Sequence, residues 1–160
     1  MRRSVSLDRM GPKLLLVWAG IALGVAFVAT PAKFLAPSLS LSVALDVGRH
    51  TFAAYDRLEL AVLAGLLGLG VWLEDRRRWY ALLLLPAAIV LAEALWLLPA
   101  LDLRVVEILA GRPADKRSTL HAIYIAAEGL KILALLAAGL SEPGTRNARL
   151  MGRAALIRFR

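Results

Sequence analysis

Apolar residues in this chain gather into four runs, separated by shorter polar or basic stretches. The runs cover residues 14–30, 53–73, 79–98 and 120–140. Each has about 17 to 25 residues, the length that a helix needs to cross a hydrocarbon core of ~30 Å. Backbone groups in lipid must find partners within their own segment, so each run predicts a helix. The pattern predicts an all-α integral membrane protein, a single membrane domain over residues 1–160 with four transmembrane helices in an up-down-up-down bundle.

The connections between the runs differ in length and pattern. The charged turn at 74–78 is short, so the second and third helices should form an antiparallel hairpin. Residues 31–43 contain two prolines and alternate serine with leucine, which predicts an interfacial segment or a short partial helix. Residues 101–110 place apolar side chains at helical spacing, before Gly111 and Pro113. This pattern predicts a short amphipathic interfacial helix in the second outer loop.

Composition supports a membrane domain and excludes several kinds of chemistry. Hydrophobic residues make up 59% of the chain, too many for a soluble domain of this size. Cysteine is absent, which excludes disulfides, thiolate metal sites and cysteine nucleophiles. There is no Walker loop, HExxH motif or nucleophile elbow, so nothing favours an enzyme. The first run also fits a signal peptide, but its length and the proline near the cleavage position favour a retained helix.

The net charge of +8 lies mainly at the ends of the runs, which indicates a lipid bilayer rather than nucleic acid as the partner. Lysine and arginine accumulate on the cytoplasmic side of an inner membrane. One side of the predicted bundle has Arg2, Arg3, Arg9, Lys13, Arg76, Arg77, Arg78, Arg146, Arg149, Arg153, Arg158 and Arg160. The other side has only Lys33, Arg49, Arg104, Arg112, Lys116 and Arg117. We therefore expect a bacterial inner-membrane protein with both termini in the cytoplasm. Residues 141–160 would form a basic cytoplasmic tail, with a short surface helix at 148–158.

Three glutamates lie inside the apolar runs, at a similar predicted depth. At 1.5 Å per residue, Glu59 is roughly 20 Å from the cytoplasmic end of the second helix. Glu93 is about as far into the third helix, and Glu128 is slightly nearer the cytoplasmic end of the fourth. An ionised carboxylate in hydrocarbon costs at least ~2.5 kcal/mol on insertion scales, so each glutamate needs a partner or a task. Lys131, on the same helix face as Glu128, and Arg57 are the nearest cations.

Two interpretations of these carboxylates remain open. In the first, they pair with Arg57, Lys131 and Tyr124 to hold the helices in register, as in a structural or assembly subunit of a larger membrane complex. In the second, they bind or pass a small cation, a proton or a small solute. The candidate site then consists of Glu59, Glu93, Glu128, Lys131 and Arg57, with His121 and Tyr124 near its entrance.

The two histidines, His50 and His121, lie near the outer ends of the second and fourth helices. Histidines at equal depth on separate helices can ligate haem b, so a haem-binding redox protein is a third hypothesis. No other cofactor follows from the sequence. Helical phase turns Glu59 about 180° away from His50, toward Thr51 and Tyr55, which argues against a combined histidine and glutamate metal site.

Small and aromatic residues predict packing and depth. The first helix carries Gly20 and Gly24 at GxxxG spacing, which permits close helix packing within the bundle or between copies. A path through four helices is narrow, so transport would require a homo-oligomer, formed through these glycines. Tryptophans gather at membrane interfaces, which is the expected location of Trp18, Trp72, Trp79 and Trp96.

Several short motifs resemble one family. The first half reads Trp18-Ala19-Gly20, Pro31-Ala32-Lys33-Phe34 and Gly48-Arg49-His50-Thr51-Phe52. The second half reads Trp96-Leu97-Leu98-Pro99-Ala100-Leu101-Asp102-x-Arg104, then Leu120-His121-x-x-Tyr124, Glu128 and Lys131. This combination resembles small four-helix bacterial membrane proteins of unknown function, which are similar to the transmembrane protein 205 family. The resemblance spans nearly the whole chain. It implies the four-helix topology and a role for the second outer loop and the fourth helix, but no reaction or ligand.

Overall fold

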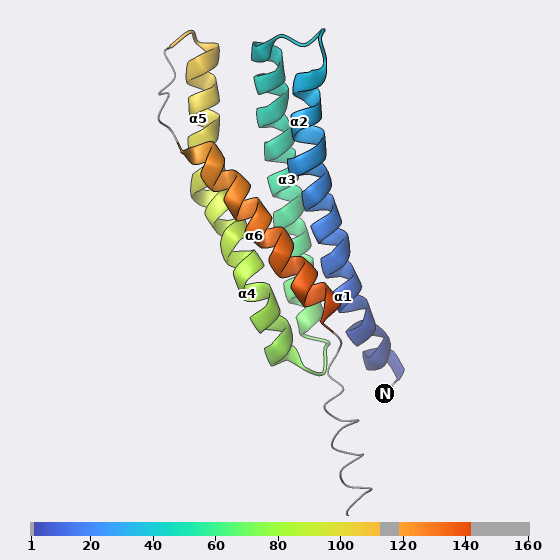
Figure 1. The fold of residues 1–160 in the computed structure, drawn as a ribbon. Coiled ribbons are helices and arrows are strands. Elements are labelled where there is room, and N and C mark those ends of the chain that lie inside the picture. Colours follow the sequence, from blue (N-terminus) through green and yellow to red (C-terminus); the bar gives the residue numbers. More distant parts are fainter. Residues whose placement is uncertain (1, 113–118, 142–160) are drawn as a thin grey trace, which may run out of the picture.

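The structure, a computed structural model, describes residues 2–112 and 119–141, and these residues are helical apart from short connections. Figure 1 shows long helical rods that run side by side. In chain order the segments are α1 (Arg2–Leu23), η1 (Gly24–Ala29), α2 (Thr30–Ala32), η2 (Lys33–Leu35), α3 (Leu41–Gly70), α4 (Arg76–Ala92), η3 (Glu93–Leu97), α5 (Leu98–Leu109) and α6 (Leu120–Leu140). The predicted tail helix at 148–158 lies outside the described residues.

Consecutive segments join into four rods in the described part of the chain. The first rod runs from α1 to the end of η2, and the second rod is α3. The third rod runs from α4 to the end of α5, and the fourth rod is α6. The N-terminus, the α3–α4 turn and the end of α6 lie at one end of the bundle (Figure 1). The all-helical class and the antiparallel hairpin of the second and third helices are therefore confirmed.

The predicted helix at 101–110 is present, but the expectation of a separate interfacial helix is wrong. α5 continues η3 without a break and ends at Leu109, so the third rod extends from Arg76 to Leu109. The sequence pattern suggested an end to the third helix near Pro99, because proline interrupts the regular bonding of an α-helix. The helix continues through this proline because its backbone widens just before it.

Both π-helical turns, η1 and η3, end two residues before a proline. Pro31 and Pro99 have no N–H, and in a regular α-helix their rings would meet the carbonyl four residues earlier. The residue before each proline, Thr30 or Leu98, donates its N–H to a carbonyl five residues back instead. One wide turn thus accommodates each proline. In the third rod, the first residue of that turn is Glu93.

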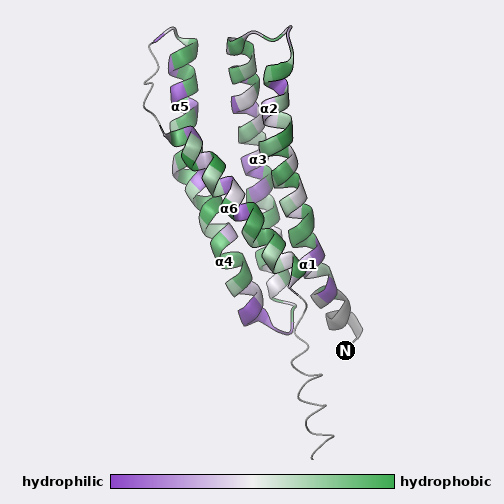
Figure 2. Cartoon of the chain, viewed as in Figure 1, coloured by the Kyte–Doolittle hydropathy of each residue, from purple (hydrophilic) through white to green (hydrophobic). Residues whose placement is uncertain are grey.

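The main apolar core lies where α1, α3, α4 and α6 meet. Its buried members are Leu15, Trp18, Ala19, Leu63, Leu66, Leu73, Trp79, Leu83, Val90, Leu135 and Ala138. Many large apolar side chains lie outside this core and are exposed. Hydrophobic residues predominate along the rods (Figure 2). Leu84, Leu95 and Leu140 are each more than 70% exposed. Apolar surface on this scale is unusual for a soluble monomer.

Three helical stretches are long and apolar enough to cross a membrane: Arg9–Leu35, Arg76–Leu109 and Leu120–Leu140. α3 is also long enough, but its apolar run carries the charged residues Asp56, Arg57 and Glu59. The second predicted span therefore differs from the others in charge, not in length. The four-span arrangement in a bilayer stays a prediction.

α1 and α6 approach each other closely at Gly139. A Cβ atom at this position would lie 2.7 Å from Leu16 Cγ and 2.9 Å from the Pro12 carbonyl oxygen. We expect Gly139→Ala to lower the free energy of unfolding by about 1–2 kcal/mol, because the backbone carbonyl cannot move aside. Thermal unfolding in detergent measures this. Gly129→Ala, on the same helix with nothing within 4 Å of the added carbon, is the control and should not destabilise.

Candidate functional site

A lysine ammonium lies at the centre of three glutamate carboxylates inside the bundle. Lys131 Nζ donates to Glu59 Oε2 at 2.6 Å, to Glu93 Oε2 at 2.7 Å and to Glu128 Oε1 at 2.9 Å. These lengths are typical of charge-assisted hydrogen bonds. None of the four side chains is more than 3% exposed. An ammonium has three N–H donors, so Lys131 has a partner for each of them.

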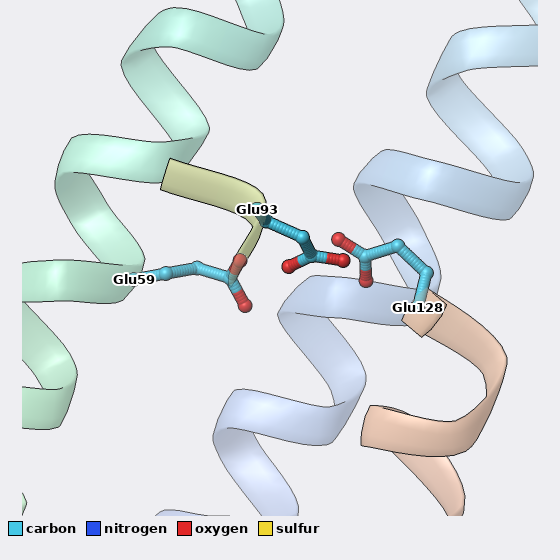
Figure 3. A group of neighbouring side chains, drawn as sticks. All are labelled: Glu59, Glu93 and Glu128. Atoms are coloured by element: carbon cyan, nitrogen blue, oxygen red, sulfur yellow. The ribbon is translucent and has the colours of Figure 1, made fainter. Parts of the chain in front are cut away.

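Three rods bring these four side chains together, and we call them the carboxylate cluster. Glu59 comes from the middle of α3, Glu93 from the start of η3, and Glu128 with Lys131 from one face of α6. Figure 3 shows the three carboxylates pointing toward one another from their separate helices. One oxygen of each lies within 4.8 Å of the others. The predicted convergence of the three glutamates is confirmed, and their depth in a bilayer stays a prediction.

Aromatic donors complete one side of the carboxylate cluster. Trp18 Nε1 and Tyr55 Oη each donate to Glu59 Oε1 at 2.8 Å. Tyr124 Oη donates to Glu128 Oε1 at 3.0 Å. Glu59 therefore has partners at both oxygens. Through the indole of Trp18, the first rod also contributes to the cluster, although it has no charged residue there.

Two oxygens of the carboxylate cluster have no hydrogen-bond partner among the residues that the structure describes. They are Glu93 Oε1 and Glu128 Oε2, and both are buried. Three carboxylates against one ammonium also leave two excess negative charges when all are ionised. Two carboxylates within 4.8 Å repel by roughly 3 kcal/mol at an effective dielectric constant of 20. The Glu93–Glu128 side is thus the part of the cluster that favours an added positive charge.

A pocket of about 460 Å³ lies next to the carboxylate cluster, toward the end of the bundle formed by η2 and α5. We call it the α3–α5 pocket. Its charged and aromatic lining consists of Lys33, Phe34, Arg49, Phe52, Asp56, Arg57, Asp102, His121 and Tyr124. Tyr124 belongs to both features, because it lines the pocket and its hydroxyl binds Glu128. It is therefore the connection between the pocket and the buried carboxylates.

α3 and α5 are joined beside this pocket by a two-point ion pair. Arg49 Nε donates to Asp102 Oδ1 at 2.7 Å, and Arg49 Nη2 donates to Asp102 Oδ2 at 3.1 Å. The hydrogen bond with Asp102 raises the pKa of Arg49 above its ordinary value. The pairing of parallel N–H groups with both carboxylate oxygens fixes the relative orientation of the two helices. Sequence reasoning placed both residues near the outer side but did not pair them.

The predicted site residues separate into two groups. Glu59, Glu93, Glu128, Lys131 and Tyr124 form the carboxylate cluster or bind it directly. Arg57 and His121 instead line the α3–α5 pocket. Both are exposed, and the structure gives no ion pair between Arg57 and the glutamates. The proposed pairing of Arg57 with a buried glutamate is therefore wrong, because Lys131 takes that place for all three.

The structure places the two histidines considered for haem in different surroundings. His50 is 75% exposed, and its Nδ1 lies 3.0 Å from the Asp46 carbonyl oxygen. His121 lines the α3–α5 pocket, whereas His50 does not. The expected separation of His50 from Glu59 around α3 is confirmed, since Tyr55 on the Glu59 face donates to that carboxylate. Haem ligation by this pair has no support from the geometry.

Two of the four tryptophans are buried inside the bundle, and the interfacial location predicted for the four stays a prediction. Trp18 is 1% exposed and binds Glu59, and Trp79 is 5% exposed and donates to the Leu66 carbonyl oxygen at 2.9 Å. Trp72 and Trp96 are exposed, as expected for interfacial side chains. The signal for Trp18 was available in the sequence: a buried indole N–H needs an acceptor, and an acidic side chain in a neighbouring apolar run can supply one.

The GxxxG glycines lie beside open space in the part of the chain that the structure describes. Cβ atoms at Gly20 and Gly24 would meet nothing within 4 Å. Packing between copies stays a prediction. The function of the carboxylate cluster and of the α3–α5 pocket must be inferred from their own geometry, because comparisons of the chain with protein-family models, curated proteins and solved structures found no match.

Proposed function

We propose that this chain is a membrane protein that binds and exchanges protons at the Glu93–Glu128 side of its carboxylate cluster. The observation that carries the proposal is the pair of buried oxygens without partners, Glu93 Oε1 and Glu128 Oε2. A proton on either oxygen supplies a donor where the cluster has only acceptors. It also reduces the excess negative charge. Acidic groups in membrane spans are commonly parts of proton or ion pathways.

A membrane location is part of this proposal. It is supported by the three helical stretches long and apolar enough to cross a bilayer, and by the apolar outer faces of the rods. The excess of lysine and arginine on the side of the two termini favours a bacterial inner membrane with cytoplasmic termini. The motif resemblance to the transmembrane protein 205 family is compatible with this location and stays a proposal. The α3–α5 pocket would then open toward the outer side.

A proton fits this site better than a metal ion. The centre of the three carboxylates, where a cation would be coordinated, is occupied by the ammonium of Lys131. A metal ion would have to displace that ammonium and leave it buried without partners, which is strongly unfavourable. A proton needs no such displacement. The oxygens that would accept it are the two that Lys131 does not contact.

Tyr124 provides the route between the pocket and the buried carboxylates. Its side chain is 3% exposed, lines the α3–α5 pocket and donates to Glu128 Oε1. A hydroxyl both donates and accepts a hydrogen bond, so it can receive a proton from the pocket side while it passes its own to the carboxylate. Proton exchange would therefore proceed from the pocket through Tyr124 to Glu128 Oε1, and rotation of the Glu128 carboxyl group would then turn the proton to the side of Oε2, from which it reaches Glu93.

Replacing Glu93 with glutamine tests the proposal. We expect the wild-type protein in liposomes to show the infrared band of protonated carboxyl groups as the pH falls, and to carry protons under an imposed membrane potential. Glu93→Gln should weaken that band and lower the proton flux by about 100-fold, because a positioned acid–base group contributes on this scale. A pH-sensitive dye trapped inside the liposomes measures the flux. Glu107→Gln, an exposed side chain on α5, is the control.

The competing interpretation is a structural or assembly subunit, in which the cluster only holds the helices together. The full set of partners around Lys131 supports it. Under this interpretation the wild-type protein carries no protons, and Glu93→Gln changes neither the infrared band nor the flux beyond the Glu107→Gln control. Such a result would refute proton exchange and leave only the structural role.

A further inference from the structure

The α3–α5 pocket has the size and wall chemistry of a small-molecule site. Its volume of about 460 Å³ is within the range of ordinary ligand pockets, roughly 300–1,000 Å³. Phe34, Phe52, Leu98 and Val105 contribute apolar walls from η2, α3 and α5. A few charged side chains are placed among them. This combination orients a ligand that has an apolar body and one polar end.

The charges around the pocket leave one cation in excess. Lys33, Arg49 and Arg57 face two carboxylates, those of Asp56 and Asp102, which gives a net charge of +1 with histidine neutral. Arg49 is paired with Asp102, and Asp56 precedes Arg57 directly in the chain. Lys33 has no carboxylate partner among residues 2–112 and 119–141. The pocket therefore has the charge to hold a monoanion rather than a dianion.

The Lys33 ammonium is held inside the pocket by aromatic rings. Its Nζ lies 5.1 Å from the ring centroid of Phe34 and 5.6 Å from that of Phe52. The absence of a side chain at Gly48 makes room for it, since a Cβ there would contact Lys33 Nζ. Cation–π contacts position an ammonium but accept none of its three N–H bonds. Those donors are available to a ligand.

We propose that the α3–α5 pocket binds a small organic acid, as a monoanion with an apolar or aromatic body. The carboxylate would accept hydrogen bonds from Lys33, and the body would pack against Phe52 and the apolar wall of α5. Charge-assisted hydrogen bonds in a largely apolar pocket are strong enough to select a carboxylate over its neutral amide. The site does not depend on proton exchange, because none of the four side chains of the carboxylate cluster is among the described residues that line the pocket, and Tyr124 joins the two through its bond to Glu128.

Benzoate and its neutral analogue benzamide are suitable probes. We expect benzoate to bind the full chain in phosphatidylcholine nanodiscs with one site per chain, and benzamide to bind at least about tenfold more weakly. Lys33→Gln should raise the dissociation constant of benzoate about tenfold. Gly48→Ala should also weaken benzoate binding although it changes no charge, because the added carbon displaces the Lys33 ammonium. Isothermal titration calorimetry measures all three.

Two controls keep the result specific. Arg112→Gln removes an exposed cation that is paired with Glu107 and should leave benzoate affinity unchanged. Glu93 does not line the pocket, so Glu93→Gln should also leave benzoate affinity unchanged. Benzoate binding therefore tests the pocket separately from the proton-exchange proposal. Equal affinities for benzoate and benzamide, or an unaltered affinity in Lys33→Gln, would overturn the proposal. Loss of benzoate binding when phosphatidylglycerol is added would also overturn it, since an anionic lipid would then be the occupant.

Discussion

Lys131→Met is expected to destabilise the bundle by about 3–5 kcal/mol, the largest effect of any single substitution considered. The methionine side chain is close to lysine in length and keeps the apolar contacts. Among residues 2–112 and 119–141, the substitution removes the only cation that pairs with Glu59, Glu93 and Glu128. Three carboxylates would then lie together in a site that excludes water, with two hydroxyls and one indole as their remaining donors.

Thermal unfolding of the purified protein in detergent measures this effect. Lys13→Met, which removes an exposed lysine from α1, is the matched control and should unfold close to the wild type. Replacing the three glutamates with glutamine in the Lys131→Met background should recover most of the lost stability, because a buried ionic network can be exchanged for neutral groups at little cost. If Lys131→Met unfolds at the same temperature as Lys13→Met, the cluster does not depend on a charged lysine.

The convergence of the glutamates could be predicted from the sequence, because the height of a residue along a helix depends only on the number of residues that separate it from the helix end. At 1.5 Å per residue, positions 59, 93 and 128 reach similar heights whatever the detailed packing. The partner of each carboxylate depends on helix rotation and tilt, which spacing along one helix does not determine. Lys131 could therefore be assigned to Glu128, three residues away, but not to Glu59 or Glu93. Arg57 was chosen for its closeness in sequence, yet residues two apart on a helix do not face each other.

The continuity of the third rod could not be predicted from the sequence for a different reason. Proline normally ends or kinks a helix, so Pro99 suggested the start of a loop. The wide turn that accommodates it depends on the N–H of Leu98 bonding to the Glu93 carbonyl oxygen. No residue pattern encodes that shift directly. One consequence for the site is that Glu93 begins a π-turn, a feature that is frequent at functional positions.

The second large effect is expected at Glu59, where a glutamine substitution should be far more harmful than the same substitution at Glu93. Oε1 of Glu59 accepts from Trp18 and Tyr55, and Oε2 accepts from Lys131. A carboxamide has only one acceptor oxygen. Its NH₂ group must therefore face either an ammonium or an indole N–H. Tyr55 can rotate its hydroxyl to accept, but Trp18 cannot.

We therefore expect Glu59→Gln to lower the free energy of unfolding by about 2–3 kcal/mol, the cost of a buried donor without an acceptor. Glu93→Gln should change it by less than about 1 kcal/mol, because glutamine can keep its oxygen on Lys131 and direct its NH₂ toward the Glu128 carboxylate, whose Oε2 is an acceptor without a partner. Glu128→Gln should behave like Glu93→Gln for the same reason, with Tyr124 and Lys131 still bound to one oxygen.

Denaturation of the three glutamine variants in one detergent tests this order. Glutamine has the shape and the donor of a protonated glutamic acid, so tolerance at Glu93 and Glu128 alone identifies the carboxyl groups that can accept a proton within the folded bundle. Equal losses at all three positions would contradict that assignment, because the two oxygens without partners would then give their side chains no advantage. A smaller loss at Glu59 than at Glu93 would place the exchangeable proton on α3 instead, between Lys131 and the aromatic donors.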